Sequence, residues 1–211
     1  MAQATLKRSL FLVLIALLMC SIQVNGCTSG DDDDDNDDDN GSGIVMPLTL
    51  NNIWNYSYQA GAAVSGTYSI QVVGDQSVNG VSVKKLDYAG DLYGQDYWIY
   101  LQNQSDGLYF YGDTIWGELA NPDLWAKYPC SVGDTWQTSG QGGVVNWTVI
   151  STSDTVTVAA GTFSCLHVRG FPQGSSEPAD HWWSVGIGEV KASVSLGTYD
   201  LVQELTSYQL N

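Results

Sequence analysis

Two stretches of this chain repeat one pattern, and that repetition limits the possible fold more than any other feature. In each stretch a proline is followed seven residues later by a tryptophan that opens a run of strand-forming residues. Pro47 leads to Trp54, and Pro129 leads to Trp136, so the two copies are 82 positions apart. A constant interval of this length is typical of a duplicated structural unit.

Later landmarks keep nearly the same interval. Leu86 and Leu166 are 80 positions apart and lie in runs of similar composition. Chance matches of aromatic residues in a tryptophan-rich chain are the alternative. We expect internal repeats over about residues 46–112 and 128–196.

The residues after position 44 favour strands almost throughout. β-branched and aromatic residues dominate, and turn residues interrupt them at intervals of about 8–12 positions. Asn79-Gly80 is a strong hairpin signal. The exception is Asn121-Pro122 and the residues up to Trp125, where a capping residue before proline predicts one short helical turn.

The predicted fold class is therefore all-β. So many strands in sequential hairpins would leave exposed edges unless the sheet curls. We expect an antiparallel barrel or strongly curved sheet of about ten to thirteen strands, built from two similar halves. Residues 44–211 are expected to form this single β domain.

Charge narrows the choice of partners. The 211 residues carry a formal net charge of −16, and eight of the acids are Asp31–Asp35 and Asp37–Asp39. Phosphate groups are bound by clustered Lys and Arg, which this acidic chain lacks. Nucleic acid is therefore not an expected partner.

The first residues have the layout of an export signal. Lys7-Arg8 precede the apolar run Leu10–Met19, which is too short for a spanning helix but suits a signal peptide. The next stretch, Val24-Asn25-Gly26-Cys27, resembles a bacterial lipobox. The resemblance implies cleavage after residue 26 and acylation of Cys27, with an ordinary secreted protein as the alternative.

This resemblance also implies a location. Thr28 rather than Asp follows the cysteine, which in enteric bacteria favours sorting to the outer membrane. Residues 27–43 would then be a lipidated cysteine followed by an acidic flexible tether, since like charges repel and glycines add freedom. Several acyl chains on one cysteine give stable membrane anchoring.

Three motifs of the second half resemble a family of bacterial lipoproteins without an assigned activity. They are Pro129-x-x-x-Gly133-Asp134-x-Trp136, Val156-x-Val158-x-Ala160-Gly161-Thr162-Phe163 and Trp183-x-x-Gly186-x-Gly188-x-Val190-Lys191. The resemblance covers roughly residues 129–191, with a weaker copy upstream. It implies an envelope compartment and a β fold, and it implies no chemistry.

Two cysteines remain after Cys27. An exported protein meets an oxidising compartment, so a disulfide between Cys130 and Cys165 is the first interpretation, and two buried free thiols are the second. The chain has no Cys-x-x-Cys and no histidine pair at ligand spacing. We expect neither a metal site nor a cofactor.

Catalytic patterns are weak. His181 stands next to Asp180, and Glu177 with Asp180 could be imagined as a glycosidase pair, but no recognised catalytic motif accompanies them. Local charge pairing or exposure is the simpler interpretation. The chain is not expected to be an enzyme, and a hydrolase is kept only as the least favoured alternative.

The eight tryptophans are the best functional hint. Aromatic rings stack on sugars or line apolar pockets, and a barrel mouth is a common ligand site. Most of these rings are expected in the core. Trp116, Trp125 and Trp182 are the candidates for an exposed or pocket-lining role.

Together these features favour a non-enzymatic lipoprotein of the cell envelope. Its β domain would bind a hydrophobic ligand, a glycan or another envelope protein. A structural or surface-assembly component is the alternative.

Overall fold

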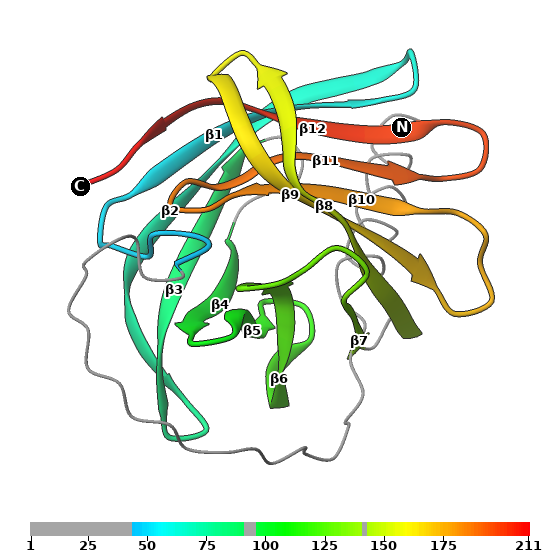
Figure 1. The fold of residues 1–211 in the computed structure, drawn as a ribbon. Coiled ribbons are helices and arrows are strands. Elements are labelled where there is room, and N and C mark those ends of the chain that lie inside the picture. Colours follow the sequence, from blue (N-terminus) through cyan, green and yellow to red (C-terminus); the bar gives the residue numbers. More distant parts are fainter. Residues whose placement is uncertain (1–43, 91–95, 141–142) are drawn as a thin grey trace, which may run out of the picture.

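The computed structural model describes residues 44–90, 96–140 and 143–211, and these residues form one antiparallel sheet of twelve strands (Figure 1). The strands of the first half are β1 (Ile53–Ala60), β2 (Val64–Val78), β3 (Val81–Gly90), β4 (Tyr97–Gln104), β5 (Gly107–Asp113) and β6 (Gly117–Lys127). Those of the second half are β7 (Thr135–Gly140), β8 (Gly143–Val158), β9 (Gly161–Pro172), β10 (Ala179–Ser184), β11 (Gly188–Ser195) and β12 (Asp200–Gln209).

Each half is a meander of six strands, and the two meanders join through β1 and β12. The sheet order is β6-β5-β4-β3-β2-β1-β12-β11-β10-β9-β8-β7. Each strand of the second half begins 79 to 83 positions after the corresponding strand of the first half. The all-β class, the strand number and the curved sheet of two similar halves are confirmed. An origin by duplication stays a prediction.

The sheet curls into a nearly closed barrel whose two edges, β6 and β7, meet at a seam (Figure 1). No backbone pairing links β6 to β7 among the described residues. Side chains bridge the seam instead. Trp136 Nε1 donates to Leu124 O at 2.9 Å, and Lys127 Nζ lies 3.1 Å from Asp134 Oδ2.

The predicted helical turn at residues 121–125 is wrong, because these residues belong to β6. In the pairing of β6 with β5, Glu118 lies opposite Gly112 and Asp123 lies opposite Phe110. The β6 residues between Glu118 and Asp123 have no partner in this register. Pro122 falls in this bulge on an edge strand. There its missing N–H removes no ladder hydrogen bond.

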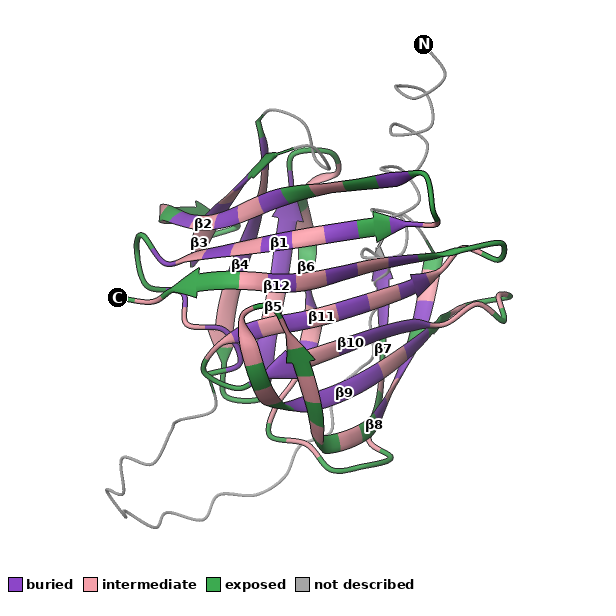
Figure 2. Ribbon diagram, turned by 90° about the horizontal axis from the view of Figure 1, so that it is seen from above, coloured by how far each residue is buried: buried purple, intermediate pink, exposed green. Residues whose placement is uncertain are grey.

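Alternation of side chains builds the core. In β1 every second residue is buried, and the same period runs through β11 (Figure 2). The inward side chains of both halves form one continuous hydrophobic cluster that includes Trp54, Tyr56, Trp147 and Trp183. The barrel interior is therefore a shared core.

Two long hairpins extend beyond the barrel and fold back over its outer wall. The β2–β3 flap (residues 73–84) lays Val78 and Val83 on Tyr100 and Tyr111 as a second, smaller apolar cluster. The β8–β9 flap (residues 151–164) turns back over β12. Both flaps leave the sheet at a β-bulge, where an extra residue bends the strand.

The β8–β9 flap is fastened to the last strand by two contacts. Ala160 N donates to Leu205 O at 3.2 Å, and the Phe163 and Tyr208 rings lie 6.1 Å apart.

The barrel has two distinguishable ends. The segment 44–52 crosses one of them, which we call the entry end. Trp54 Nε1 donates to Ile187 O at 2.6 Å, and Asn103 Nδ2 donates to Met46 O at 2.8 Å. The connections β6–β7 and β10–β11 and the last residue of the chain lie at the entry end, and β1–β2, β5–β6 and β11–β12 turn at the far end.

At two places in the wall, an aromatic ring lies over a glycine of the neighbouring strand. Tyr58 pairs with Gly66, and Trp147 pairs with Gly170. A Cβ placed on Gly170 would lie 2.5 Å from the Trp147 ring. Glycine is needed there because the ring occupies the space of a side chain.

We expect Gly170→Ala to destabilise the barrel. The added methyl must displace the Trp147 ring, and overpacking of this kind costs about 1–3 kcal/mol. Gly74→Ala is the matched control, since its Cβ would meet nothing within 4 Å. Urea unfolding curves of both variants measure the difference. Equal stabilities of the two variants would show that the ring does not require glycine.

Candidate functional site

The three tryptophans singled out from the sequence do not lie together. Trp125 faces the interior, with ring centroids 5.7 Å from Phe110 and 5.9 Å from Trp183. Trp182 lies on the outer wall, and Trp116 follows β5 in the turn to β6. A pocket-lining role for them stays a prediction, and the pocket described below is lined by none of the three.

The two remaining cysteines are free thiols and form no disulfide. Cys130 packs against the main core, which also holds Leu166 and Val168 of β9. Cys165 alternates with those two residues and therefore faces the opposite side of the strand. Cys27 lies outside the described residues.

Neither thiol is activated. Burial, followed by the nearby Asp134 carboxylate, raises the pKa of Cys130. Burial, followed by the charge of Asp154, raises the pKa of Cys165 to about 11. The thiolate is the nucleophilic form, so both side chains are poor nucleophiles near neutral pH.

Asp180 and His181 face opposite sides of β10, so they do not form the imagined acid–base couple. His181 points inward, where its ring meets Trp147 at 5.3 Å, and its Nδ1 lies 2.5 Å from Glu189 Oε1. Gln203 Nε2 donates to Glu189 Oε2 at 2.6 Å, and Gln203 Oε1 accepts from Tyr68 Oη at 2.9 Å. This chain of four polar side chains crosses β10, β11, β12 and β2 inside the barrel.

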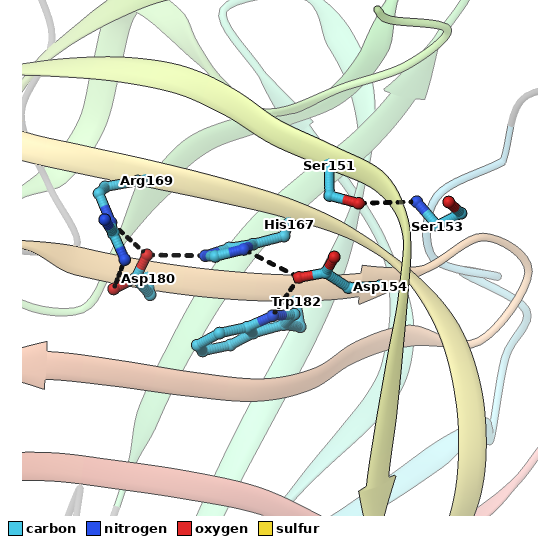
Figure 3. A network of polar contacts seen from close by, with 7 residues as sticks. All are labelled: Ser151, Ser153, Asp154, His167, Arg169, Asp180 and Trp182. Atoms are coloured by element: carbon cyan, nitrogen blue, oxygen red, sulfur yellow. Dashed lines mark hydrogen bonds and ion pairs between the residues drawn. The ribbon is translucent and has the colours of Figure 1, made fainter. Parts of the chain in front are cut away.

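Asp180 takes part in a different network, on the outer wall of the second half (Figure 3). His167 lies between two carboxylates, with Nδ1 3.0 Å from Asp154 Oδ2 and Nε2 2.7 Å from Asp180 Oδ1. Both ring nitrogens of His167 are therefore engaged by carboxylates. Arg169 donates to both oxygens of Asp180, at 2.7 Å and 3.1 Å.

Trp182 completes the network and connects it to the flap. Its ring stacks on His167 at a centroid distance of 4.5 Å, and its Nε1 donates to Asp154 Oδ2 at 3.4 Å (Figure 3). Lys191 Nζ lies 5.9 Å from the Trp182 centroid. Asp154 belongs to the β8–β9 flap, so this network fastens the flap to the wall.

The two carboxylates of the network remain ionised. Burial alone would raise the pKa of Asp180, but the hydrogen bonds and charges of His167 and Arg169 outweigh it and lower the pKa below its usual value. The pKa of Asp154 is also lowered, first by a hydrogen bond from Ser151 and then by Trp182 and His167.

A pocket of about 460 Å³ opens at the entry end, beneath the β8–β9 flap. The flap contributes one wall, β9 and the β10–β11 turn another, and the β6–β7 connection a third. Its lining residues are Tyr128, Cys130, Thr152, Thr162, Phe163, Ser164, Leu166, Ser184 and Val185. They are apolar or carry hydroxyl groups, and none is charged.

Two of the sequence motifs bear on the position of this pocket. Thr162-Phe163 and Gly186 belong to the second and third motifs that resemble the lipoprotein family, and the pocket lies where those motifs meet. Their spacing in the chain does not show that they converge.

No group of three His, Cys, Asp or Glu side chains among the described residues is arranged to hold a metal ion. The described residues also contain no helix long and apolar enough to cross a membrane.

Comparisons with known proteins give distant structural likenesses. No protein-family model matches the sequence, and no curated protein is similar enough to count as a relative. A candidate lipoprotein of Parabacteroides distasonis aligns with a TM-score of 0.49 and 13% identity, over 81% of this chain and 100% of its own. A candidate exported protein of Bacteroides fragilis with a YmcC-like fold aligns with a TM-score of 0.49 and 10% identity, over 80% of this chain and 100% of its own. Likeness at this level carries no argument about what this chain does.

We expect Asp180→Asn to destabilise the protein by roughly 2–3 kcal/mol near neutral pH, because it removes charged hydrogen bonds to His167 and Arg169. The ionised form is the stabilising one, since its pKa is lowered on folding. The difference from the unsubstituted protein should therefore persist above the ordinary pKa of about 3.9 and disappear as the pH falls through the lower folded value.

The control is Asp87→Asn, which removes a surface ion pair with Lys85, in which the two side chains are 46% and 31% exposed. Exposed pairs contribute about 0–1 kcal/mol. Thermal unfolding of both variants between pH 3 and pH 7, in steps of about one unit, measures the two effects. A pH-independent loss for Asp180→Asn would mean that packing, and not charge, carries the contribution of Asp180.

Proposed function

We propose that this chain is a lipid-anchored protein of the bacterial cell envelope that binds a neutral hydrophobic ligand of the acyl-chain class in the pocket beneath the β8–β9 flap. The observation that carries the proposal is the uncharged lining of that pocket in a strongly acidic chain. Burying a charged group without a partner is costly, so such a lining selects against charged ligands.

The lining also explains how an amphiphilic ligand would lie. Phe163, Leu166 and Val185 offer apolar contact to a hydrocarbon chain, and Thr152 and Ser164 offer hydroxyl groups to a polar, uncharged head. Apolar walls with a few polar groups are the usual composition of small-molecule sites.

A binding role is favoured over a catalytic one by the placement of the polar groups. Asp180 is committed to His167 and Arg169, and the Glu177 carboxylate accepts a hydrogen bond from Ser195. The only thiol in the pocket, Cys130, has a raised pKa. These groups hold the wall together and leave no activated nucleophile facing the pocket.

The anchor belongs to the same proposal. Cys27 would carry the acyl chains, and the outer membrane of a Gram-negative bacterium is the compartment that its flanking residues favour. Ile44, the first described residue, bonds to Gly186 of the β10–β11 turn at the entry end. Ile44 therefore lies beside the turn that contributes Val185 to the pocket.

Filling the pocket should abolish binding. We expect Ser164→Phe, which places a ring among the lining residues, to weaken binding of mono-oleoylglycerol at least roughly tenfold, or about 1.4 kcal/mol. Thr155→Phe is the control, because Thr155 is exposed on the same flap and does not line the pocket. Native mass spectrometry of the mature chain, titrated with this neutral lipid, gives the bound fraction.

The same spectra test the anchor, since acylation at Cys27 adds the mass of the acyl chains to the mature chain. Binding that Ser164→Phe and Thr155→Phe leave equally strong would refute the pocket. A mature chain that begins at Cys27 without added mass would refute the anchor.

A further inference from the structure

The exposed apolar side chains of the barrel are gathered at one end. Ten large hydrophobic residues among the described part of the chain are exposed, and seven lie at the entry end with 37% to 63% of their surface exposed. The seven are Ile44, Leu50, Val73, Val132, Ile150, Val185 and Tyr208. The other three, Ile115, Phe171 and Tyr199, lie toward the far end.

Backbone hydrogen bonds hold neighbouring members of this group together. Val185 lies next to Ile44, Leu50 next to Val73, and Val132 next to Ile150. The bonds that place them are Gly186 N to Ile44 O, Asn51 N to Val72 O and Gly133 N to Val149 O, each 2.9 Å long. In sheet order these positions follow the barrel rim from β2 through β1, β12, β11 and β10 to β8. We call this set of seven residues the apolar rim.

The segments that carry the apolar rim contain few charges. Residues 44–52 and 184–188 have no charged side chain, and residues 209–211 have none either. Two acidic residues near rim positions are paired: Asp75, two residues after Val73, with Lys84, and Asp134 of the β6–β7 connection with Lys127. An exposed patch that is both apolar and nearly uncharged marks an interaction surface, and its chemistry fits an uncharged partner.

We propose that the apolar rim rests against the surface of a bilayer of zwitterionic phospholipid, so that the pocket opens beside the membrane. The proposal rests on the anchor at Cys27. Ile44 is 17 positions after Cys27, so the intervening chain can span at most roughly 60 Å. That length keeps the barrel near the bilayer without orienting it, and the apolar rim supplies the orientation.

A lipid surface suits the rim better than a second copy of this chain. The rim is a narrow arc of neighbouring side chains at the margin of one barrel end, and it includes Val185, which also lines the pocket. Insertion among neutral headgroups buries each side chain independently, whereas a protein partner would need a matching arc. The acidic excess of the chain opposes contact between two copies and also opposes anionic lipids.

The mature chain, held by Cys27 in a supported phosphatidylcholine bilayer, tests this arrangement. Neutron reflectometry measures the water layer between the headgroups and the barrel. We expect no water layer for the unsubstituted protein, and a layer at least one water molecule thick for the triple variant Leu50→Asp, Val132→Asp, Val185→Asp. The matched control Ile115→Asp, Phe171→Asp, Tyr199→Asp adds the same charge at the far end and should keep the contact.

Each of the other outcomes contradicts the proposed contact between the apolar rim and the bilayer. A water layer beneath the unsubstituted barrel, an unchanged contact in the first variant or an equal loss in the control would each refute it, as would a dimer that buries the rim. All six substituted side chains are exposed, and if a triple variant fails to unfold cooperatively, Val132→Asp and Phe171→Asp alone replace the pair.

Mass spectrometry separates this idea from the proposed function. A mature chain that lacks acyl groups overturns both the anchor and the surface. An acylated chain with a water layer overturns the surface alone and leaves ligand binding to its own test.

Discussion

The antiparallel pairing of β1 with β12 is the contact on which the rest of the structure depends. It joins the first and last strands of the domain, eight residues of β1 facing their partners from Ile53–Gln209 to Ala60–Leu201. Without it, each half would be an open meander with two unpaired edges. With it, Trp54 reaches Ile187 and Tyr56 reaches the backbone of Glu189, and the interior becomes one core instead of two faces. The polar chain from Tyr68 to His181 also crosses this junction.

The seam between β6 and β7 shows what happens where this pairing is missing. By position in their halves, β6 and β7 correspond to β12 and β1, yet only the latter pair is joined by a backbone ladder. The bulge around Pro122 leaves several β6 residues unpaired even with β5. Trp136 and Lys127 replace the ladder with two side-chain contacts. The two halves are thus similar in order and different in how their free edges end.

The two flaps also differ, in the kind of contact that holds each one against the barrel wall. The β2–β3 flap is held by an apolar cluster around Val78 and Tyr100, which does not depend on pH. The β8–β9 flap is held in part by Asp154 through His167 and Trp182, and therefore by charge. Only this second flap forms a wall of the pocket. The contacts of Asp154 require its ionised form, so this part of the fastening depends on pH.

Local signals in the sequence were sufficient to predict the fold class, but they were not sufficient to predict the site. Alternating burial, Asn79-Gly80 and the interval between Trp54 and Trp136 all report on neighbouring residues or on repetition, and each held in the structure. The predicted turn at Asn121-Pro122 failed because a bulge on an edge strand accommodates proline as well as a helix start does. The conformational preference of proline therefore does not distinguish a helix start from a bulge on an edge strand.

The site escaped prediction for a different reason. Cys130 and Cys165 look like a pair in a list of residues, but strand alternation puts Cys165 on the face away from the core that Cys130 contacts. Alternation along β10 also puts His181 and Asp180 on opposite faces. The partner of Asp180 is instead His167, which comes from the neighbouring strand β9. A one-residue change in register reverses every such assignment, and register is set by the bulges at Val149 and Trp182, which no local pattern marks.

The position of the pocket follows from where the barrel's long hairpins leave the sheet. Both bulges that release the flaps lie toward the entry end, so the flaps, the segment 44–52 and the β10–β11 turn all meet there. At the far end, the fully described connections have three to six residues and no hairpin folds back over the wall. Ile44, the first described residue, is held at the entry end, where its carbonyl oxygen accepts from Gly186 N. The pocket therefore lies where three segments distant in the sequence come together, namely the β6–β7 connection, the β8–β9 flap and the β10–β11 turn.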